Sequence, residues 1–253
     1  MSKSMEQKVA LVTGAGSGIG RAIAYHFANE GARVVVSDID VAGGEETVTK
    51  IRARGNDARA VFVRADTGKP EDSAALVGAA VKEFGALHVA VNNAGIGGPS
   101  APVGEYPIEG WDQVIRVNLS GVFYGMRYQI PAMLEAGGGS IVNIASILGQ
   151  VGFPNAPAYV AAKHGVVGLT QNAALEYGAR NIRVNVVGPG FIKTPMLDKN
   201  LTPEILAMLA TKHALGRLGE ASEVAELVLW LSSDKASFVT GGYYAVDGGY
   251  LAQ

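Results

Sequence analysis

A tyrosine and a lysine lie four positions apart in a segment whose composition is typical of a helix, Tyr159-Val160-Ala161-Ala162-Lys163. Residues spaced by four lie on the same face of a helix, so the phenol of Tyr159 and the ammonium of Lys163 would be neighbours. A free phenol has a pKa of about 10, and a nearby cation lowers that pKa. The pair could therefore give or take a proton near neutral pH, which is general acid–base chemistry. Because the same spacing also occurs on ordinary solvated helices, the assignment depends on the rest of the chain.

The composition narrows the classes of protein to which the chain could belong. Its 253 residues are 48% hydrophobic and 17% charged, with a net charge of −2, which allows a sizeable core and argues against a nucleic-acid-binding face. There is no cysteine for a disulfide, a thiol nucleophile or a thiolate metal site, and the 4 histidines are too scattered to predict a metal site. A polar start over residues 1–8 and the lack of a long uncharged apolar run predict a cytoplasmic protein without a signal peptide or a membrane span.

Short apolar runs alternate with helical patterns along the whole chain. This alternation predicts a parallel sheet with helices on both faces. No linker or change in composition divides the chain, so we expect a single α/β domain over residues 1–253, doubly wound around a seven-stranded parallel sheet. The predicted strands are 8–13, 33–37, 58–64, 87–91, 140–145, 183–187 and 243–246, and the predicted helices are 21–30, 44–54, 70–84, 111–133, 159–177 and 222–231.

A glycine cluster follows the first predicted strand and opens the first predicted helix. Its spacing is Gly14-x-x-x-Gly18-x-Gly20, and backbone N–H groups at such a helix start form a site for a pyrophosphate. Asp38 ends the second strand, 20 residues after Gly18, where a carboxylate accepts hydrogen bonds from an adenosine ribose and repels a 2′-phosphate. Neither Ser17 nor the neighbours of Asp38 supply a compensating cation. The pattern favours NAD over NADP, with a tight turn at the glycines and a strand-end cap at Asp38 as the alternative interpretations.

Further motifs follow the glycine cluster in a fixed order along the chain. With the cluster itself, they are Thr13-Gly14-(x)3-Gly18-Ile19-Gly20, Asp66, Asn92-Asn93-Ala94-Gly95, Asn118, Ser146, Tyr159-(x)3-Lys163, Asn185 and Pro189-Gly190 with Thr194. Together these residues resemble the short-chain dehydrogenase/reductase family over essentially the whole chain. Ser146 precedes Tyr159 by 13 residues, which is the usual interval in that family. The resemblance implies a Rossmann fold and an oxidoreductase that moves a hydride between NAD(H) and a secondary alcohol or ketone.

The resemblance also implies a role for each matching residue. Tyr159 would be the catalytic acid/base, Ser146 would hydrogen-bond the substrate oxygen, and Lys163 would bind the nicotinamide ribose and lower the pKa of Tyr159. Asn118 would hold a water molecule in a proton relay. The residues implied to bind NAD are Gly14, Ser17, Gly18, Ile19, Asp38, Asp66, Thr67, Asn92, Ala94, Gly95, Tyr159, Lys163, Pro189, Gly190, Ile192 and Thr194.

The segments that flank the predicted catalytic face are mostly apolar and carry no cluster of Arg or Lys. We therefore expect a hydrophobic or cyclic secondary alcohol or ketone as the substrate, with Leu148, Phe153 and Phe191 among its contacts. Residues 191–215 would form a lid over the substrate, since lids that close over reactants are common in such enzymes. Each of these apolar residues could equally serve only to pack the lid.

Two other functions fit parts of the same pattern. A 3-oxoacyl-thioester reductase or a sugar dehydrogenase resembles the same motif set, but the reductase usually prefers NADPH, which Asp38 disfavours. A non-catalytic NAD-binding regulatory protein could share the fold. Such a protein would have no need of the Tyr159 phenol.

The resemblance finally implies a homotetramer with the Tyr159 helix and the C-terminal strand at its interfaces. Small side chains on that helix would allow close approach of a second subunit, although they are also ordinary helix formers. These side chains belong to Ala156, Ala158, Ala161, Ala162, Ala173 and Ala174.

Overall fold

The computed structural model describes residues 3–53, 59–195, 197 and 202–253. Each predicted strand and helix is present, with boundaries within three residues of those predicted; Arg54 and Ala58, at two predicted ends, lie outside the described residues. The elements are β1 (Val9–Thr13), α1 (Gly18–Asn29), β2 (Arg33–Asp38), α2 (Val41–Arg52), β3 (Ala60–Arg64), α3 (Pro70–Phe84), β4 (Val89–Asn92), α4 (Ile108–Ile115), α5 (Gly121–Glu135), β5 (Gly139–Ile144), α6 (Pro157–Tyr177), β6 (Ile182–Pro189), β7 (Ile192–Lys193), α8 (Pro203–Thr211), β8 (Gly219–Glu220), α9 (Ala221–Ser232) and β9 (Tyr243–Val246).

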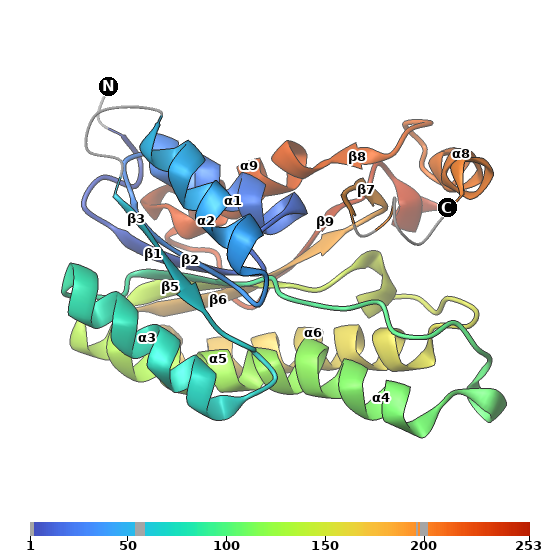
Figure 1. Ribbon diagram of the computed structural model, residues 1–253, viewed down its shortest axis with the longest axis horizontal. Helices are drawn as coiled ribbons and strands as arrows, with labels where there is room; N and C mark the ends of the chain where they lie inside the picture. Colours follow the sequence, from blue (N-terminus) through green and yellow to red (C-terminus); the bar gives the residue numbers. More distant parts are fainter. Residues whose placement is uncertain (1–2, 54–58, 196, 198–201) are drawn as a thin grey trace.

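Seven strands run parallel in one sheet with the order β3-β2-β1-β4-β5-β6-β9 (Figure 1). The register brings Ala10 of β1 opposite Val34 of β2 on one side and opposite Val89 of β4 on the other. From β1 the chain builds outward through β2 and β3, and from β4 it builds in the opposite direction to β9. At such a reversal the loops that follow the strands diverge and leave a crevice for a ligand. The predicted doubly wound Rossmann fold is confirmed.

Helices cover both faces of the sheet (Figure 1). Successive side chains of a strand point to opposite faces, so in β1 Leu11 belongs to one core layer and Val12 to the other. Helices α1, α2 and α9 pack on one face through residues such as Phe27, and α3, α5 and α6 pack on the other through residues such as Met133. Full burial of each large apolar side chain contributes about 1.5–3 kcal/mol. The two layers therefore hold the carboxyl edge of the sheet in a fixed shape.

The helix predicted over residues 111–133 is not a continuous α-helix. It begins earlier, at Ile108, and a π-helical segment, Arg116–Ser120, separates α4 from α5. A π segment inserts an extra residue into the helical turn and occurs frequently at functional sites. The hydrophobic period of the sequence gives no sign of this insertion, which lies at Asn118.

Helix α6 has 21 residues and begins with Pro157, whose fixed φ suits the first helical turn. Four of its six interface candidates, Ala158, Ala162, Ala173 and Ala174, are buried in the core of the protomer itself. Their small size therefore lets α6 pack on its own sheet and on α4, which corrects the expectation that these four contact a second subunit. No helix in the described part of the chain is long and apolar enough to cross a membrane.

The stretch after residue 188 contains short elements of its own. Strand β7 pairs in parallel with β8 in a small separate sheet, and α8 lies between them along the chain. The buried imidazole of His213 connects this region to the end of β6, because its Nε2 accepts a hydrogen bond of 3.2 Å from the Phe191 N–H. The predicted lid, residues 191–215, includes Met196 and residues 198–201, which lie outside the described residues.

Candidate active site

Ser146 follows β5 and is held by its own turn. It begins a short 3-10 helix, Ile147–Gly149, in which its Oγ accepts a hydrogen bond of 3.2 Å from the Leu148 N–H and its carbonyl accepts one of 2.9 Å from the Gly149 N–H. Because the Leu148 N–H occupies a lone pair of Oγ, the hydroxyl hydrogen remains for another acceptor. The phenol of Tyr159 is the side chain that interacts with this hydroxyl.

Tyr159 and Lys163 share one face of α6, as their spacing predicts. The Nζ of Lys163 lies 5.4 Å from the centroid of the Tyr159 ring, which is within the range of a cation–π contact. The ammonium is buried and donates a hydrogen bond of 2.8 Å to the carbonyl of Ile144, at the end of β5. This bond ties α6 to the strand that leads to Ser146. The three predicted catalytic groups therefore converge at the carboxyl end of β5.

Burial is the largest influence on the pKa values of Tyr159 and Lys163. Burial raises the pKa of the Tyr159 phenol, and the hydrogen bond with Ser146 lowers it only in part. Burial also lowers the pKa of Lys163, to about 8. The expectation that Lys163 gives Tyr159 a lowered pKa is therefore wrong for the groups of the chain itself. The phenol is a proton donor at neutral pH, and the lysine loses its charge in mildly alkaline solution.

Asn118 lies in the π segment and holds the loop after β4. Its Oδ1 accepts a hydrogen bond of 2.8 Å from the Ile96 N–H, and its Nδ2 donates one of 2.8 Å to the Ile96 carbonyl. A Cβ at Gly95 would lie 3.2 Å from the Asn118 Oδ1 and 3.8 Å from the Lys163 Nζ. Gly95, Asn118 and Lys163 are thus neighbours, although they come from three different elements.

The glycine loop leaves the start of α1 open to an anion. Ser17 is the N-cap residue of α1, and its side chain makes no capping hydrogen bond, so the first N–H groups of the helix are not satisfied by their own cap. Gly18 has a φ of +52°, and a Cβ there would lie 3.2 Å from the Thr194 side chain. Ile19 packs against the core behind the loop. The predicted phosphate-binding glycines and Thr194 are therefore adjacent, and they fit a dinucleotide.

Asp38 lies directly beside this loop. Its Oδ2 accepts a hydrogen bond of 2.8 Å from the Gly16 N–H, and its Oδ1 accepts one of 3.0 Å from the Asp40 N–H. Sequence analysis identified no cation here, but the structure brings Arg21 to the same loop through a hydrogen bond to the Gly16 carbonyl. The Arg21 guanidinium also pairs with Glu46 at 2.7 Å, so its charge is already neutralised.

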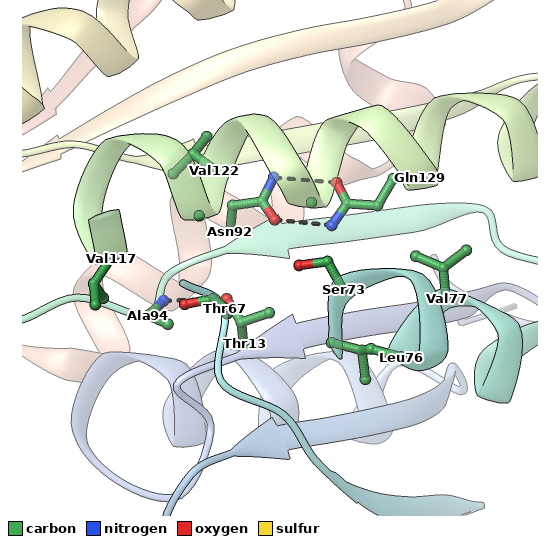
Figure 2. A pocket seen from close by; sticks show the side chains of 12 residues that line it. Thr13, Thr67, Ser73, Leu76, Val77, Asn92, Ala94, Val117, Val122 and Gln129 are labelled. Carbon is green, nitrogen blue, oxygen red and sulfur yellow. Dashed lines mark hydrogen bonds between the residues drawn. The ribbon is translucent and has the colours of Figure 1, made fainter. Parts of the chain in front are cut away.

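The last residue of β4, Asn92, has a side chain that cannot face a cofactor. Figure 2 shows the amides of Asn92 and Gln129 paired side by side in the core, with hydrogen bonds of 3.1 and 2.8 Å. Asn92 also donates a bond of 2.8 Å to Asn143 of β5. Thr67 and Ala94 line the same small buried cavity. The side chain of Asn92 therefore links β4, β5 and α5, and only its backbone is available to a ligand.

Asp66 follows β3 by two residues and organises the turn there. Its Oδ1 accepts a hydrogen bond of 2.9 Å from the Gly68 N–H, and its Oδ2 lies 3.3 Å from the Arg116 guanidinium. The backbone N–H of Asp66 donates to Asp72 of α3 at 2.8 Å. The residue thus stands at the carboxyl edge, two strands from Gly14, as an adenine contact would require.

The rings of Phe153, Phe191, His213 and Tyr250 form an aromatic group beyond the end of β6, after Pro189 and Gly190. The ring of Phe191 lies 6.0 Å from that of Phe153 and 5.9 Å from that of Tyr250. The imidazole of His213 lies 5.8 Å from Phe191 and 5.7 Å from Tyr250. Two predicted substrate residues are therefore in contact, while Leu148 is buried beside Ser146. Tyr250 and His213 could not be predicted as part of this group, because no local motif in the sequence marks either one.

Comparison with known proteins identifies the family. The family model described as enoyl-(acyl carrier protein) reductase matches residues 14–251. The chain is 52% identical over 253 residues to a cyclohexanol dehydrogenase of Acinetobacter sp. (strain SE19), with 100% of this chain and 98% of the relative covered. The chain belongs to the short-chain dehydrogenase/reductase family. It is an oxidoreductase, and the family uses a nicotinamide cofactor.

Two further relatives of this short-chain dehydrogenase/reductase agree with that assignment. A cis-4-hydroxycyclohexanecarboxylate dehydrogenase of Sinomonas cyclohexanicum is 44% identical over 252 residues, with 100% of both chains covered. The crystal structure of levodione reductase superposes with a TM-score of 0.94 and 38% identity, and the match covers 98% of each chain. The family and fold predicted from the sequence are therefore confirmed.

Proposed function

We propose that this oxidoreductase is an NAD-dependent dehydrogenase of hydrophobic cyclic secondary alcohols, with Tyr159 as its acid/base. The observation that carries the proposal is the convergence of the Tyr159 phenol, the Ser146 hydroxyl and the Lys163 ammonium at one end of β5. A phenol in contact with both a hydroxyl and a buried cation is suited to moving a proton. A protein that only bound the dinucleotide would not need this group.

The preference for NAD rests on Asp38. Its carboxylate lies beside the glycine loop, where a 2′-phosphate would meet like charge. Arg21 reaches the same loop through the Gly16 carbonyl, and Glu46 already neutralises its charge. Thr194, Ile192, Pro189 and Gly190 complete the proposed cofactor site at the end of β6.

The chain's own groups handle the proton of the reaction. When bound, NAD supplies the acceptor for the hydride that leaves the carbinol carbon. Ser146 donates a hydrogen bond to the substrate oxygen, where negative charge develops, and Tyr159 in its phenolate form accepts the hydroxyl proton. Asn118 and Lys163 connect this proton to solvent. Because burial raises the pKa of Tyr159, oxidation should accelerate as the pH rises, and ketone reduction should be favoured nearer to neutral pH.

The aromatic group beyond β6 supports a cyclic, apolar substrate. Phe153, Phe191 and Tyr250 contribute flat apolar surfaces, and none of them brings a formal charge. The names of two relatives, cyclohexanol dehydrogenase and cis-4-hydroxycyclohexanecarboxylate dehydrogenase, describe substrates with a six-membered carbon ring. Such substrates are consistent with these apolar aromatic surfaces. We include in the proposal a cytoplasmic location, where a dissociable nicotinamide cofactor is regenerated, and a homotetrameric assembly.

Turnover of cyclohexanol with NAD, followed by NADH absorbance, tests the proposed function. We expect activity with cyclohexanol, little with glucose or linear polyols, and a large loss when NADP replaces NAD. Substitution Y159F should lower kcat by about 10²–10⁴-fold, the usual contribution of a general acid or base. The dissociation constant for NADH should stay within about twofold of the unsubstituted enzyme.

A matched control lies on the same helix. Tyr177 is partly buried at the far end of α6, where its ring contacts Arg180. Substitution Y177F should therefore leave turnover unchanged. Full activity of Y159F, or turnover confined to sugars, would refute the proposed acid/base or the proposed substrate class.

A further inference from the structure

Tyr243 of β9 makes a hydrogen bond to the backbone of Ser146 across the sheet. Its hydroxyl donates to the Ser146 carbonyl at 3.0 Å, although the two residues are 97 positions apart in the chain. Ser146 is otherwise hydrogen-bonded to the N–H groups of Leu148 and Gly149 in its own turn and, through its hydroxyl, to the Tyr159 phenol. Among the described residues, Tyr243 is the side chain that bonds the backbone of this turn from a different element of the fold.

The phenol reaches Ser146 by crossing the strand in between. Strand β6 lies between β5 and β9, and neighbouring strands are about 4.8 Å apart, so β9 and β5 are separated by roughly 10 Å. The register sets Tyr243 opposite Val186, and Gly188 lies on the same face of β6, two residues further on. A Cβ at Gly188 would overlap the Tyr243 hydroxyl. The absence of a side chain at Gly188 therefore makes the path of the phenol possible.

We propose that Tyr243 is a positioning residue of the dehydrogenase reaction, which holds the Ser146 turn so that the serine hydroxyl meets the substrate oxygen and the Tyr159 phenol. The inference rests on the proposed roles of Ser146 and Tyr159. It assigns to β9 a part in catalysis that no local motif indicates. The neighbouring Tyr244 packs on the opposite face of the sheet and makes no hydrogen bond to Ser146 in the described part of the chain.

The donor is suited to a permanent structural bond. Burial, together with the negative charge of Asp247, raises the pKa of Tyr243 to about 12, so the hydroxyl keeps its hydrogen throughout the working range of the enzyme. Tyr159 differs, because its phenol faces Ser146 and the Lys163 ammonium and takes part in proton transfer. Since the Ser146 hydroxyl lowers the pKa of Tyr159, a displaced Ser146 should leave that pKa higher.

Substitution Y243F removes only the hydroxyl and tests the proposal directly. We expect kcat for cyclohexanol oxidation to fall about tenfold, as loss of one hydrogen bond to a positioned group allows. The pH at which oxidation reaches half its maximal rate should move upward. The dissociation constant for NADH, measured by its fluorescence, should stay within about twofold, because β9 is not part of the proposed dinucleotide site. Substitution Y244F, the matched control, should change none of these quantities.

The outcomes separate this inference from the proposed function. If the unsubstituted enzyme oxidises cyclohexanol with NAD and Y243F matches it in kcat and pH profile, the positioning role is overturned and the proposed function stands. A lower melting temperature with an unmoved pH profile would also overturn it, since that result describes a packing residue. If the unsubstituted enzyme itself lacks this activity, the proposed function fails first. A fall in kcat with a raised apparent pKa supports the proposal.

Discussion

Lys163 is a buried charged residue that affects both the proposed reaction and the stability of the fold. Among the described residues, the Ile144 carbonyl at 2.8 Å accepts a hydrogen bond from its ammonium, which also faces the ring of Tyr159 at 5.4 Å. Burial of an ammonium without a counter-ion disfavours its charged form, which is why the pKa of Lys163 falls to about 8. The fold therefore tolerates an unfavourable charge at the point where the proposed reaction needs a cation.

The replacement K163M should separate these two properties. The pKa of this lysine is 10.5 when unfolded and about 8 when folded, so below pH 8 both states are protonated and folding must bury the charge. Between pH 8 and 10.5 the unfolded state binds more protons, so the stability of the parent enzyme rises with pH. At pH 7 we expect the free energy of unfolding of K163M to be about 1–3 kcal/mol higher than that of the parent enzyme. Its turnover should be lost.

Urea denaturation at pH 7 and at pH 9.5 measures this effect. The stability advantage of K163M should shrink at the higher pH, where the parent no longer buries a full charge. Substitution K82M, on the outward-facing side of α3, is a control that should show no such dependence. An advantage of equal size at both pH values would contradict the assigned pKa.

At the scale of elements, α2 and α1 each hold the glycine loop through one side chain. The buried hydroxyl of Thr47 lies 2.9 Å from the carbonyl of Ala15, and Arg21 donates to the carbonyl of Gly16. The N–H and C=O of a trans peptide point in opposite directions. With the Ala15 carbonyl turned towards Thr47 and the Gly16 carbonyl towards Arg21, the N–H of Gly16 points to Asp38 and that of Ser17 points away from Arg21.

Substitution T47V should therefore weaken binding of NADH and of ADP by about tenfold, because it leaves the Ala15 carbonyl without its donor. Substitution T47S keeps the hydroxyl and should restore affinity. Thr49 lies on the exposed side of the same helix, so T49V is the matched control and should bind like the parent. Calorimetric titration gives the three dissociation constants. Equal affinities for T47V and T49V would show that the loop holds its shape without α2.

At the scale of the whole molecule, the surface suggests where subunits meet. Large apolar side chains are exposed on the helical layer formed by α4 and α5, among them Trp111 and Phe123, and near the C-terminus, among them Trp230 and Phe238. Exposed apolar side chains that gather on one face commonly mark an interaction site. Leu175 of α6 is exposed as well, so we add α4 and α5 to α6 as candidates for the interface of the proposed tetramer.

Light scattering tests the assembly. We expect a mass near four times that of the 26.2 kDa chain. Substitution F123R places a charge on a side chain that is 48% exposed and should lower the mass to that of a dimer or monomer. Val41 on α2 is 49% exposed on the other helical layer, so V41R should leave the mass unchanged. A monomer at micromolar concentration in the parent would refute the tetramer.

The sequence alone determined the features that depend on short-range spacing. Strand and helix periods predicted the sheet and its helices to within three residues, because side-chain direction repeats every two or 3.6 residues whatever lies around the segment. The same local geometry brought Tyr159 and Lys163 to one face of α6. The order of the motifs was enough to identify the family and the proposed catalytic groups.

Only the tertiary structure decided the properties that depend on packing between distant segments. Burial set the pKa values of Tyr159 and Lys163 in directions that their spacing did not predict. It also turned the side chain of Asn92 into the core and brought Tyr250 and His213 to Phe191. The bond from Tyr243 to Ser146 joins positions 97 residues apart across an intervening strand. No local pattern encodes such a contact, because it exists only once three strands have taken their places in the sheet.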